Sequence, residues 1–347
     1  MRSPAESRTS LSHDEPTSEQ LWKHSRPFRD KKDDRCVSKA GKFRWYRGNK
    51  RFRPDVYRAK ALFYFTFIQC DIKRGWVNME TIVFVGAGSM AEAIIAGMVV
   101  RNTEDAKRIY VMNKSDDDRL DYMQGRYGIS IVCPERKALK FADMIVLATK
   151  PKDIRQAMAE IAPHLNDHTA ALSVIAGTPI KTIEQGLGMR PIARSMPNTS
   201  ATIGKSASGI AMNSKVDQRC KDQFIQLLSS IGIVKEVREE DLHAVTALSG
   251  SGPAYVYYLV EALEEAAIDK GLSKEIAREL IIQTLDGAAS MLKMTGEDPI
   301  TLRQNVTSPG GTTEAGLNAL ETRKFKQTIA ECIDSAEGRS RELGALS

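Results

Sequence analysis

Residues 308–313, with the sequence Ser-Pro-Gly-Gly-Thr-Thr, combine the residue types that bind a small anion. Pro309 cannot continue a helix, and Gly310 and Gly311 can adopt positive φ, so we expect a tight turn. An apolar-periodic run follows, so the turn would place free N–H groups at the start of a helix. Such a terminus favours a carboxylate or a phosphate. The other interpretation, a glycine-rich start of a helix with threonine as its N-cap, fits these residues equally well.

The hydroxyls of Ser308, Thr312 and Thr313 would add directional hydrogen bonds around such an anion. No Ser-His-Asp set can be argued from spacing, and His243, alone in the helical half, is typical of a packing or surface histidine. Strong acid-base chemistry is therefore not indicated. We expect a substrate that is already electrophilic, such as a protonated imine, which the protein needs only to position and shield.

A second candidate site begins at residue 81. The apolar run at 81–85 has the length of a buried strand, a glycine-rich loop follows it, and a helix opens directly afterwards. In this context the G-x-G-x-x-A pattern predicts a dinucleotide loop, because the glycines allow a tight turn and close approach of a pyrophosphate. The loop consists of Gly86, Ala87, Gly88, Ser89, Met90 and Ala91.

The choice of cofactor rests on the end of the second strand, at 108–112. An NAD-selective site usually carries an acid there, whereas this chain has Asn113, Lys114 and Ser115. Lysine and serine suit a 2′-phosphate, so we expect NADPH as the preferred cofactor, with NADH as the alternative. The three aspartates at 116–118 are typical of the first turn of the next helix.

Two further buried strands, at 143–148 and 170–175, end in loops that carry Lys150, Pro151 and Ala176. The carboxyl edge of a parallel sheet is where such folds bind ligands, so these residues are candidate cofactor contacts. Lys150 has a second interpretation as a solvated surface lysine.

The elements predict an α/β region followed by an all-α region. Strands are expected at 191–195, 210–212 and 233–235, with a helix at 217–230, and the alternation stops near Arg238. We therefore expect a Rossmann-type NADP-binding domain at 79–238 and a helical substrate-binding and dimerisation domain at 239–347. The apolar stripes at 256–267 and 276–292 are wide enough to be covered on more than one side, which predicts a homodimer at least.

Composition narrows the class of protein. Residues 1–78 carry 19 Lys+Arg and 9 Asp+Glu, whereas residues 79–347 carry 31 and 35, a net charge of −4 that argues against a nucleic-acid partner. The five cysteines are widely spaced without a C-x-x-C pair, which indicates a reduced cytoplasmic protein without a metal site. No apolar run reaches the roughly 18 residues of a membrane span.

Residues 1–78 differ from the rest, because they hold 12 of the 22 aromatic residues and show no sustained periodicity. RNA binding and a targeting peptide are two interpretations. We favour a third, in which this basic extension is disordered or not part of the native product and Met79 is the natural start.

Five segments together resemble pyrroline-5-carboxylate reductase, in collinear order from Met79 to about Leu343. They are residues 86–93 (Gly-Ala-Gly-Ser-Met-Ala-Glu-Ala), Lys150-Pro151, residues 196–199 (Met-Pro-Asn-Thr), residues 248–255 (Leu-Ser-Gly-Ser-Gly-Pro-Ala-Tyr) and residues 305–321. The resemblance implies reduction of L-1-pyrroline-5-carboxylate to L-proline with NADPH or NADH, the last step of proline biosynthesis. It also implies a helical domain that interlocks into dimers, which sometimes assemble further.

The resemblance also implies roles for single residues. Thr313 would hydrogen-bond the ring nitrogen as the catalytic residue, Glu239 would lie near the substrate, and Asn305 would lie near the nicotinamide. Ser308 and the backbone of residues 310–312 would hold the carboxylate. Two positions depart from the family pattern: Ser200 replaces a frequent proline, and Glu135 stands where we expect an asparagine.

Two rival functions remain open. One is a different reductase on the same plan, acting on a cyclic imine or a hydroxyacid, although residues 252–270 offer only Lys270 and no asparagine for hydroxyacid chemistry. The other is a non-catalytic NADP-sensing homologue, which would be expected to lose the turn at 308–313.

Overall fold

The computed structural model describes residues 79, 81–132 and 136–345. The interpretations placed on residues 1–78 and on Glu135 lie outside these described residues. The helix after the second strand begins at the three aspartates, as expected, with Asp116 as its N-cap and Asp117 and Asp118 in its first turn.

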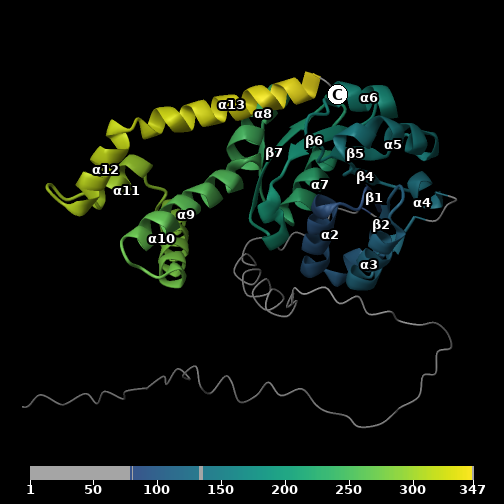
Figure 1. The fold of residues 1–347 in the computed structure, drawn as a ribbon. Coiled ribbons are helices and arrows are strands. Elements are labelled where there is room, and N and C mark those ends of the chain that lie inside the picture. Colours follow the sequence, from purple (N-terminus) through teal and green to yellow (C-terminus); the bar gives the residue numbers. More distant parts are fainter. Residues whose placement is uncertain (1–78, 80, 133–135, 346–347) are drawn as a thin grey trace, which may run out of the picture. The chain divides into compact units, whose positions relative to one another are not determined.

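Eight strands form a single sheet in the described part of the chain, in the order β3-β2-β1-β4-β5-β6-β7-β8 (Figure 1). Neighbouring strands pair in parallel except β6 and β7, which are antiparallel. The carboxyl ends of β1, β2, β4 and β5 therefore meet at one edge. The strands are β1 (Ile82–Val85), β2 (Ile109–Met112), β3 (Ser130–Ile131), β4 (Met144–Leu147), β5 (Ala170–Ser173), β6 (Ile192–Met196), β7 (Ser206–Met212) and β8 (Gly232–Glu236).

Helices cover both faces of this sheet, which is why its central strands are apolar on both sides. Along β1, Phe84 points into one buried cluster and Val83 into the other. The first cluster contains residues from α2 (Ser89–Arg101), α3 (Asp117–Tyr127) and α7 (Gln218–Ser229). The second contains residues from α4 (Lys137–Lys140), α5 (Ile154–Ile161) and α6 (Ile180–Leu187). This is the Rossmann-type layering that the sequence predicted.

Beyond β8 the described chain is helical, as predicted. Its elements are α8 (Leu242–Val245), a π-helical turn (Thr246–Gly250), α9 (Gly252–Asp269), α10 (Lys274–Thr295), α11 (Pro299–Asn305), α12 (Thr312–Thr322) and α13 (Phe325–Ala345). Ser251 precedes α9 but makes no side-chain capping bond, because its own backbone is already helical at φ −86° and ψ −17°. The chain thus enters α9 from the π-helical turn, which the sequence did not predict.

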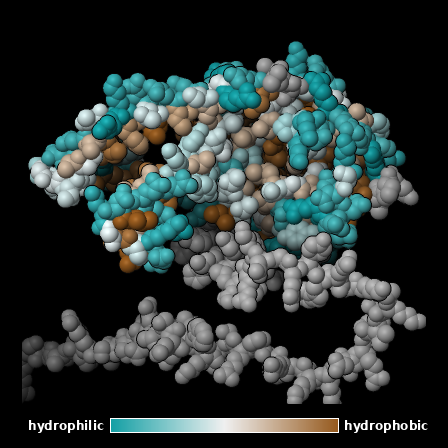
Figure 2. All heavy atoms as spheres, viewed as in Figure 1, coloured by the Kyte–Doolittle hydropathy of each residue, from teal (hydrophilic) through white to brown (hydrophobic). Residues whose placement is uncertain are grey.

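The two wide apolar stripes lie on α9 and α10. Within one chain they are substantially exposed, with Leu263 at 42% and Leu280 at 57% relative accessibility. Hydrophobic residues are accordingly visible at the surface of the helical part (Figure 2). Exposed apolar area on this scale is typical of a surface that another protein chain covers. Among the described residues, no helix is long and apolar enough to cross a membrane.

Candidate active site

The glycine-rich loop joins β1 to α2 with a backbone that requires glycine at its first position. Gly86 has φ +110°, and a Cβ built there would lie 2.5 Å from the carbonyl oxygen of Ala148. Its N–H donates to the Met112 carbonyl at 2.9 Å, at the end of β2. The loop is therefore fixed against both strands that flank β1.

Gly88 is different, because the protein itself does not fill the space beside it. A Cβ at Gly88 would meet only the Ala148 carbonyl oxygen, at 3.9 Å. Gly88 is the N-cap of α2 and no side chain caps the helix, so its first N–H groups remain available to a ligand. Gly88 and Ser89 are exposed, whereas Ala87 and Ala91 are buried in the core and Met90 packs against it. The loop fits a pyrophosphate at the helix N-terminus.

The segment after β2 also meets the same edge of the sheet. Asn113 accepts from the backbone N–H of Lys114 at 2.9 Å, and the Lys114 ammonium donates to Gln156 at 2.9 Å. Lys114 and Ser115 are exposed. The lysine is thus held over the sheet edge with its charge accessible to solvent.

Two threonines at this edge were not singled out from the sequence. The hydroxyls of Thr149 and Thr178 are buried and have no hydrogen-bond partner within the described structure. Each lies in a loop that follows a strand, β4 or β5, beside the predicted contacts Lys150 and Ala176, which are both exposed. A threonine in the loop that follows a buried strand is the signal that could have identified them, since buried hydroxyls normally find a partner.

The predicted anion turn forms, with differences in detail. Gly310 has φ +70°, which suits glycine alone, and Gly311 donates from its N–H to the Ser308 carbonyl at 3.0 Å. Gly311 is the N-cap of α12 and no side chain caps that helix, so the interpretation with threonine as the N-cap is wrong. The helix begins at Thr312, directly after Gly311. Its first backbone amides therefore have no side-chain cap.

One amide of this turn already has a carboxylate partner. The N–H of Gly310 donates to the side chain of Glu314 at 2.8 Å. Ser308, Thr312 and Thr313 are exposed, as is Asn305, the last residue of α11. The hydroxyls and the amides at the start of α12 are therefore the accessible donors of the turn.

Glu239 lies at the opposite end of the helical segment, where the chain leaves the sheet. One of its oxygens accepts from the Ile180 N–H at 2.7 Å, and so satisfies an amide at the start of α6. The same oxygen pairs with Arg194 of β6 at 3.4 Å. Burial lowers the pKa of the Arg194 guanidinium, and the charge of Glu239 opposes that shift. Glu239 therefore compensates a buried arginine at the sheet edge.

The C-terminal helix α13 packs close to this junction. His243 is paired through Nδ1 with the buried hydroxyl of Ser340 at 3.0 Å. Gly177 has φ +77°, and a Cβ there would lie 3.5 Å from the Leu343 carbonyl. The loop that carries Ala176 is therefore in contact with the end of α13. Burial lowers the pKa of His243, and the charges of Arg194 and Arg341 lower it further.

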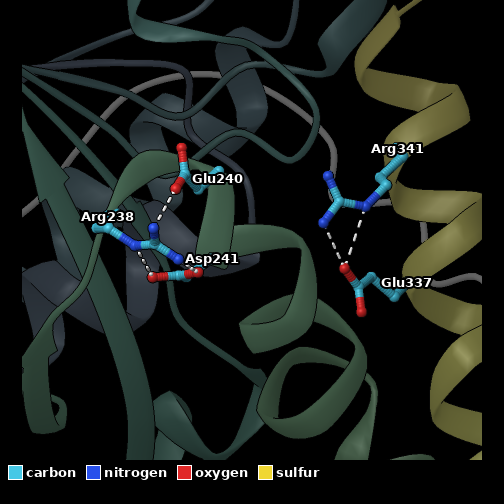
Figure 3. A network of polar contacts seen from close by, with 5 residues as sticks. All are labelled: Arg238, Glu240, Asp241, Glu337 and Arg341. Carbon is cyan, nitrogen blue, oxygen red and sulfur yellow. Dashed lines mark hydrogen bonds and ion pairs between the residues drawn. The ribbon is translucent and has the colours of Figure 1, made fainter.

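Two separate ion-pair groups lie near the same junction, one just before α8 and one on α13 (Figure 3). Arg238 donates to Asp241 at 2.9 and 2.8 Å and also pairs with Glu240. Arg341 pairs with Glu337 one turn earlier on α13. Most of these side chains are exposed, so the pairs add little to stability.

Cys220 is buried in α7, and burial raises the pKa of its thiol to about 12. It is therefore unreactive as a nucleophile at neutral pH. Cys332 lies on α13 and is partly exposed.

Comparison with known proteins agrees with this geometry. A family model described as "Pyrroline-5-carboxylate reductase dimerisation" matches residues 239–343, and one described as "NADP oxidoreductase coenzyme F420-dependent" matches residues 81–177. Pyrroline-5-carboxylate reductase 2 of Bacillus subtilis (strain 168) is 43% identical over 266 residues, covering 76% of this chain and 95% of the relative.

This chain belongs to the pyrroline-5-carboxylate reductase family. The family member from Staphylococcus aureus (strain COL) is 38% identical over 76% of this chain and 98% of its own length. Among solved structures, the pyrroline-5-carboxylate reductase of Coxiella burnetii superposes with a TM-score of 0.72 at 36% identity, over 77% of this chain and 99% of that one. The Plasmodium falciparum family member, solved with NADP bound, has a TM-score of 0.68 at 29% identity, over 78% and 100%.

Proposed function

We propose that this protein reduces the imine of L-1-pyrroline-5-carboxylate with NAD(P)H to give L-proline, the last step of proline biosynthesis. The observation that carries the proposal is the combination of two intact sites in a member of this family. One is the glycine-rich loop at residues 86–91, which leaves open space beside Gly88 at the N-terminus of α2. The other is the turn at residues 308–313, at the N-terminus of α12. A non-catalytic homologue would be expected to lose this turn, whereas this chain keeps it.

The cofactor would be held at the carboxyl edge of the sheet. The amides after Gly88 would bind the pyrophosphate, and Lys114 with Ser115 would bind a 2′-phosphate, with Asn113 shaping that loop through its bond to the Lys114 N–H. The unpartnered hydroxyl of Thr149 lies beside Lys150 and Pro151 and is a natural donor to the cofactor. Ala176 is a further proposed cofactor contact, and Asn305 would lie near the nicotinamide.

The substrate would be held by its acid group. The free amides at the start of α12 and the Ser308 hydroxyl can receive the carboxylate, and Thr313 can hydrogen-bond the ring nitrogen. Glu314 holds Gly310 in the required left-handed conformation, so in this chain the Gly310 amide supports the turn through that bond. Glu239 would lie near the substrate. Its role there would be to stabilise the adjacent edge of the sheet through its ion pair with Arg194.

The reaction needs little acid-base machinery from the protein. A protonated imine accepts a hydride directly, which the reduced nicotinamide supplies when it is bound. The side chains of this protein would orient the ring, keep water away and hold the proton on the ring nitrogen through the Thr313 hydroxyl. No role is proposed for His243, whose Nδ1 is engaged by Ser340 of α13.

The assembly proposed for this enzyme is a homodimer, which can assemble further, in the cytoplasm. The support is the exposed apolar face of α9 and α10, including Leu263 at 42% and Leu280 at 57% accessibility, in the segment that matches a dimerisation family model. A nucleic-acid partner is not proposed, because residues 79–347 are mildly acidic. Light scattering that reports a monomer at micromolar concentration would refute the dimer.

The direct test is oxidation of NADPH in the presence of L-1-pyrroline-5-carboxylate, with L-proline identified as the product by mass spectrometry. We expect a lower KM for NADPH than for NADH, and Lys114→Ala should narrow that difference. Lys152→Ala, an exposed lysine in the same region, is the matched control. NADPH oxidation with other cyclic imines or with keto acids, but not with this substrate, would favour the related reductases instead.

A further inference from the structure

A single arginine in α3 contacts the dinucleotide loop from outside. The Nε of Arg119 donates to the carbonyl oxygen of Ala87 at 2.8 Å, and its Nη2 donates to the carboxylate of Glu92 in the first turn of α2. The backbone N–H of Arg119 is held in turn by the Asp116 side chain at 2.9 Å. Arg119 therefore links the start of α3, which follows residues 113–115, to the loop at residues 86–91.

The Ala87 carbonyl is the important acceptor in this contact. The first backbone bond of α2 runs from the Glu92 N–H to the Gly88 carbonyl at 3.0 Å, so the Ala87 carbonyl lies just outside the helical ladder. The C=O of Ala87 and the N–H of Gly88 belong to one planar trans peptide and point in opposite directions. By holding the carbonyl on the α3 side, Arg119 fixes the Gly88 N–H in the opposite direction, away from α3.

The guanidinium is itself fixed by a network of aromatic and charged groups. The Tyr127 hydroxyl donates to Glu92 at 2.7 Å, and the Tyr122 hydroxyl donates to it at 3.3 Å. The Arg119 guanidinium lies 5.2 Å from the centre of the Tyr122 ring, and Arg126 lies over both tyrosine rings. Glu92 thus accepts from three side chains and holds the second nitrogen of Arg119 in one orientation.

The side chains of Arg119 and Glu92 are only 25% and 22% exposed, which distinguishes this pair from the solvated ion pairs elsewhere on the surface. A lysine could contact either Ala87 or Glu92, but not both at once in the geometry of a planar fork. The fork geometry is therefore specific to arginine at this position.

We propose that Arg119 is a positioning residue for the dinucleotide. It aligns the Gly88 peptide with the cofactor pyrophosphate, and it links the loop at residues 86–91 to residues 113–115, which would bind the 2′-phosphate. This inference rests on the proposed function only for the identity of the cofactor, NAD(P)H. Arg119 would act on the cofactor through its bond to the Ala87 carbonyl.

The test measures cofactor binding without any reaction. NADPH and NADH are titrated into the full-length protein, and the dissociation constants are obtained from nicotinamide fluorescence or calorimetry. Arg119→Ala removes a charge-assisted hydrogen bond to the loop, so we expect both dissociation constants to rise by about tenfold and by similar factors. Arg119→Lys should recover only part of the loss. In turnover assays the KM for either cofactor should rise while kcat and the KM for the imine stay nearly constant.

Arg126→Ala is the matched control. Arg126 lies on the same helix and over the same tyrosine rings, Tyr122 and Tyr127, but it donates to the Tyr122 hydroxyl at 2.8 Å and not to the loop. Arg126 reaches the loop only through Tyr122 and Glu92, so cofactor binding should weaken much less in this variant than in Arg119→Ala. Melting temperatures of all variants show whether any loss of binding comes from unfolding, and Glu92→Gln, which keeps a hydrogen-bond acceptor for Tyr127, should weaken binding less than Arg119→Ala does.

Three outcomes would overturn the inference. Unchanged dissociation constants in Arg119→Ala would show that the loop keeps its geometry without the arginine. Weakened NADPH binding with unchanged NADH binding would make Arg119 a direct ligand of the 2′-phosphate. An equal loss in Arg126→Ala would assign the effect to general disruption of α3. Tight NADPH binding by a protein that does not reduce the imine would refute the proposed function and leave this inference standing.

Discussion

The ion pair between Arg194 and Glu239 offers a sharp test of how the helical region is attached to the sheet. The Arg194 side chain is only 6% exposed, and Glu239 supplies both its counter-charge at 3.4 Å and the acceptor for the Ile180 N–H at 2.7 Å. Hydrogen bonds to charged groups contribute roughly 1.5–3 kcal/mol each to stability. Glu239 is itself 36% exposed, so solvent screening reduces the value of the pair.

We therefore expect Glu239→Ala to destabilise the protein by about 2 kcal/mol, which corresponds to a fall in Tm of about 4–8 °C for a domain of this size. Glu239→Gln should lose less, because an amide oxygen can still accept from the Ile180 N–H. The assay is urea unfolding followed by circular dichroism, with thermal melts in parallel.

Glu240→Ala is the control, since the neighbouring Glu240 side chain is 62% exposed and pairs with an Arg238 side chain that is 73% exposed. Its effect should stay within about 0.5 kcal/mol. Equal stability losses in the Glu239→Ala and Glu240→Ala variants would refute the reasoning, because they would show that the buried guanidinium of Arg194 does not depend on Glu239.

Three further predictions follow from the same geometry. Gly86→Ala places a Cβ 2.5 Å from a backbone oxygen at φ +110°, so it should cost more than about 2 kcal/mol and weaken NADPH binding, whereas Gly188→Ala, at φ +80° in open space, should cost about 1 kcal/mol and leave binding intact. An equal cost at both glycines in denaturant melts would contradict this. Burial and neighbouring arginines lower the pKa of His243 below its ordinary 6.5, so the unfolded chain binds its proton first. The stability of the wild type relative to His243→Gln should therefore be constant above pH 6.5 and decrease as the pH falls below it; an increase in acid would contradict the assignment. Thr313→Ala should lower kcat by roughly tenfold or more through loss of one hydrogen bond while NADPH still binds, and unchanged kinetics would remove Thr313 from the mechanism.

Much of the fold could be predicted from local patterns. The strand at 81–85 is a continuous apolar run because both of its faces are covered, as Val83 and Phe84 show, and the glycine loop after it follows from the need for positive φ at Gly86. The first half of β7 could not be predicted, since Ser206 to Gly209 has little strand propensity and forms through pairing with β6 and β8.

The site was predictable where a residue type is required by backbone geometry, and not where its role depends on a distant partner. Gly310 and Gly311 were identified correctly as a turn at the start of a helix. The contact of Arg119 with Ala87 joins residues 32 positions apart, and that of His243 with Ser340 joins residues 97 apart. Neither contact leaves a local signal in the sequence, because each arises from packing between helices.

The most direct test of the proposed enzyme is a crystal structure of the protein with NADP and L-proline bound. We expect the proline carboxylate to accept hydrogen bonds from the amides that follow Gly311, and the ring nitrogen to lie beside the Thr313 hydroxyl. The ring carbon that receives the hydride should lie within about 3.5 Å of the nicotinamide. If the turn at residues 308–313 lies far from the nicotinamide in every subunit of the assembly, no hydride could reach the ring, and the account would be wrong.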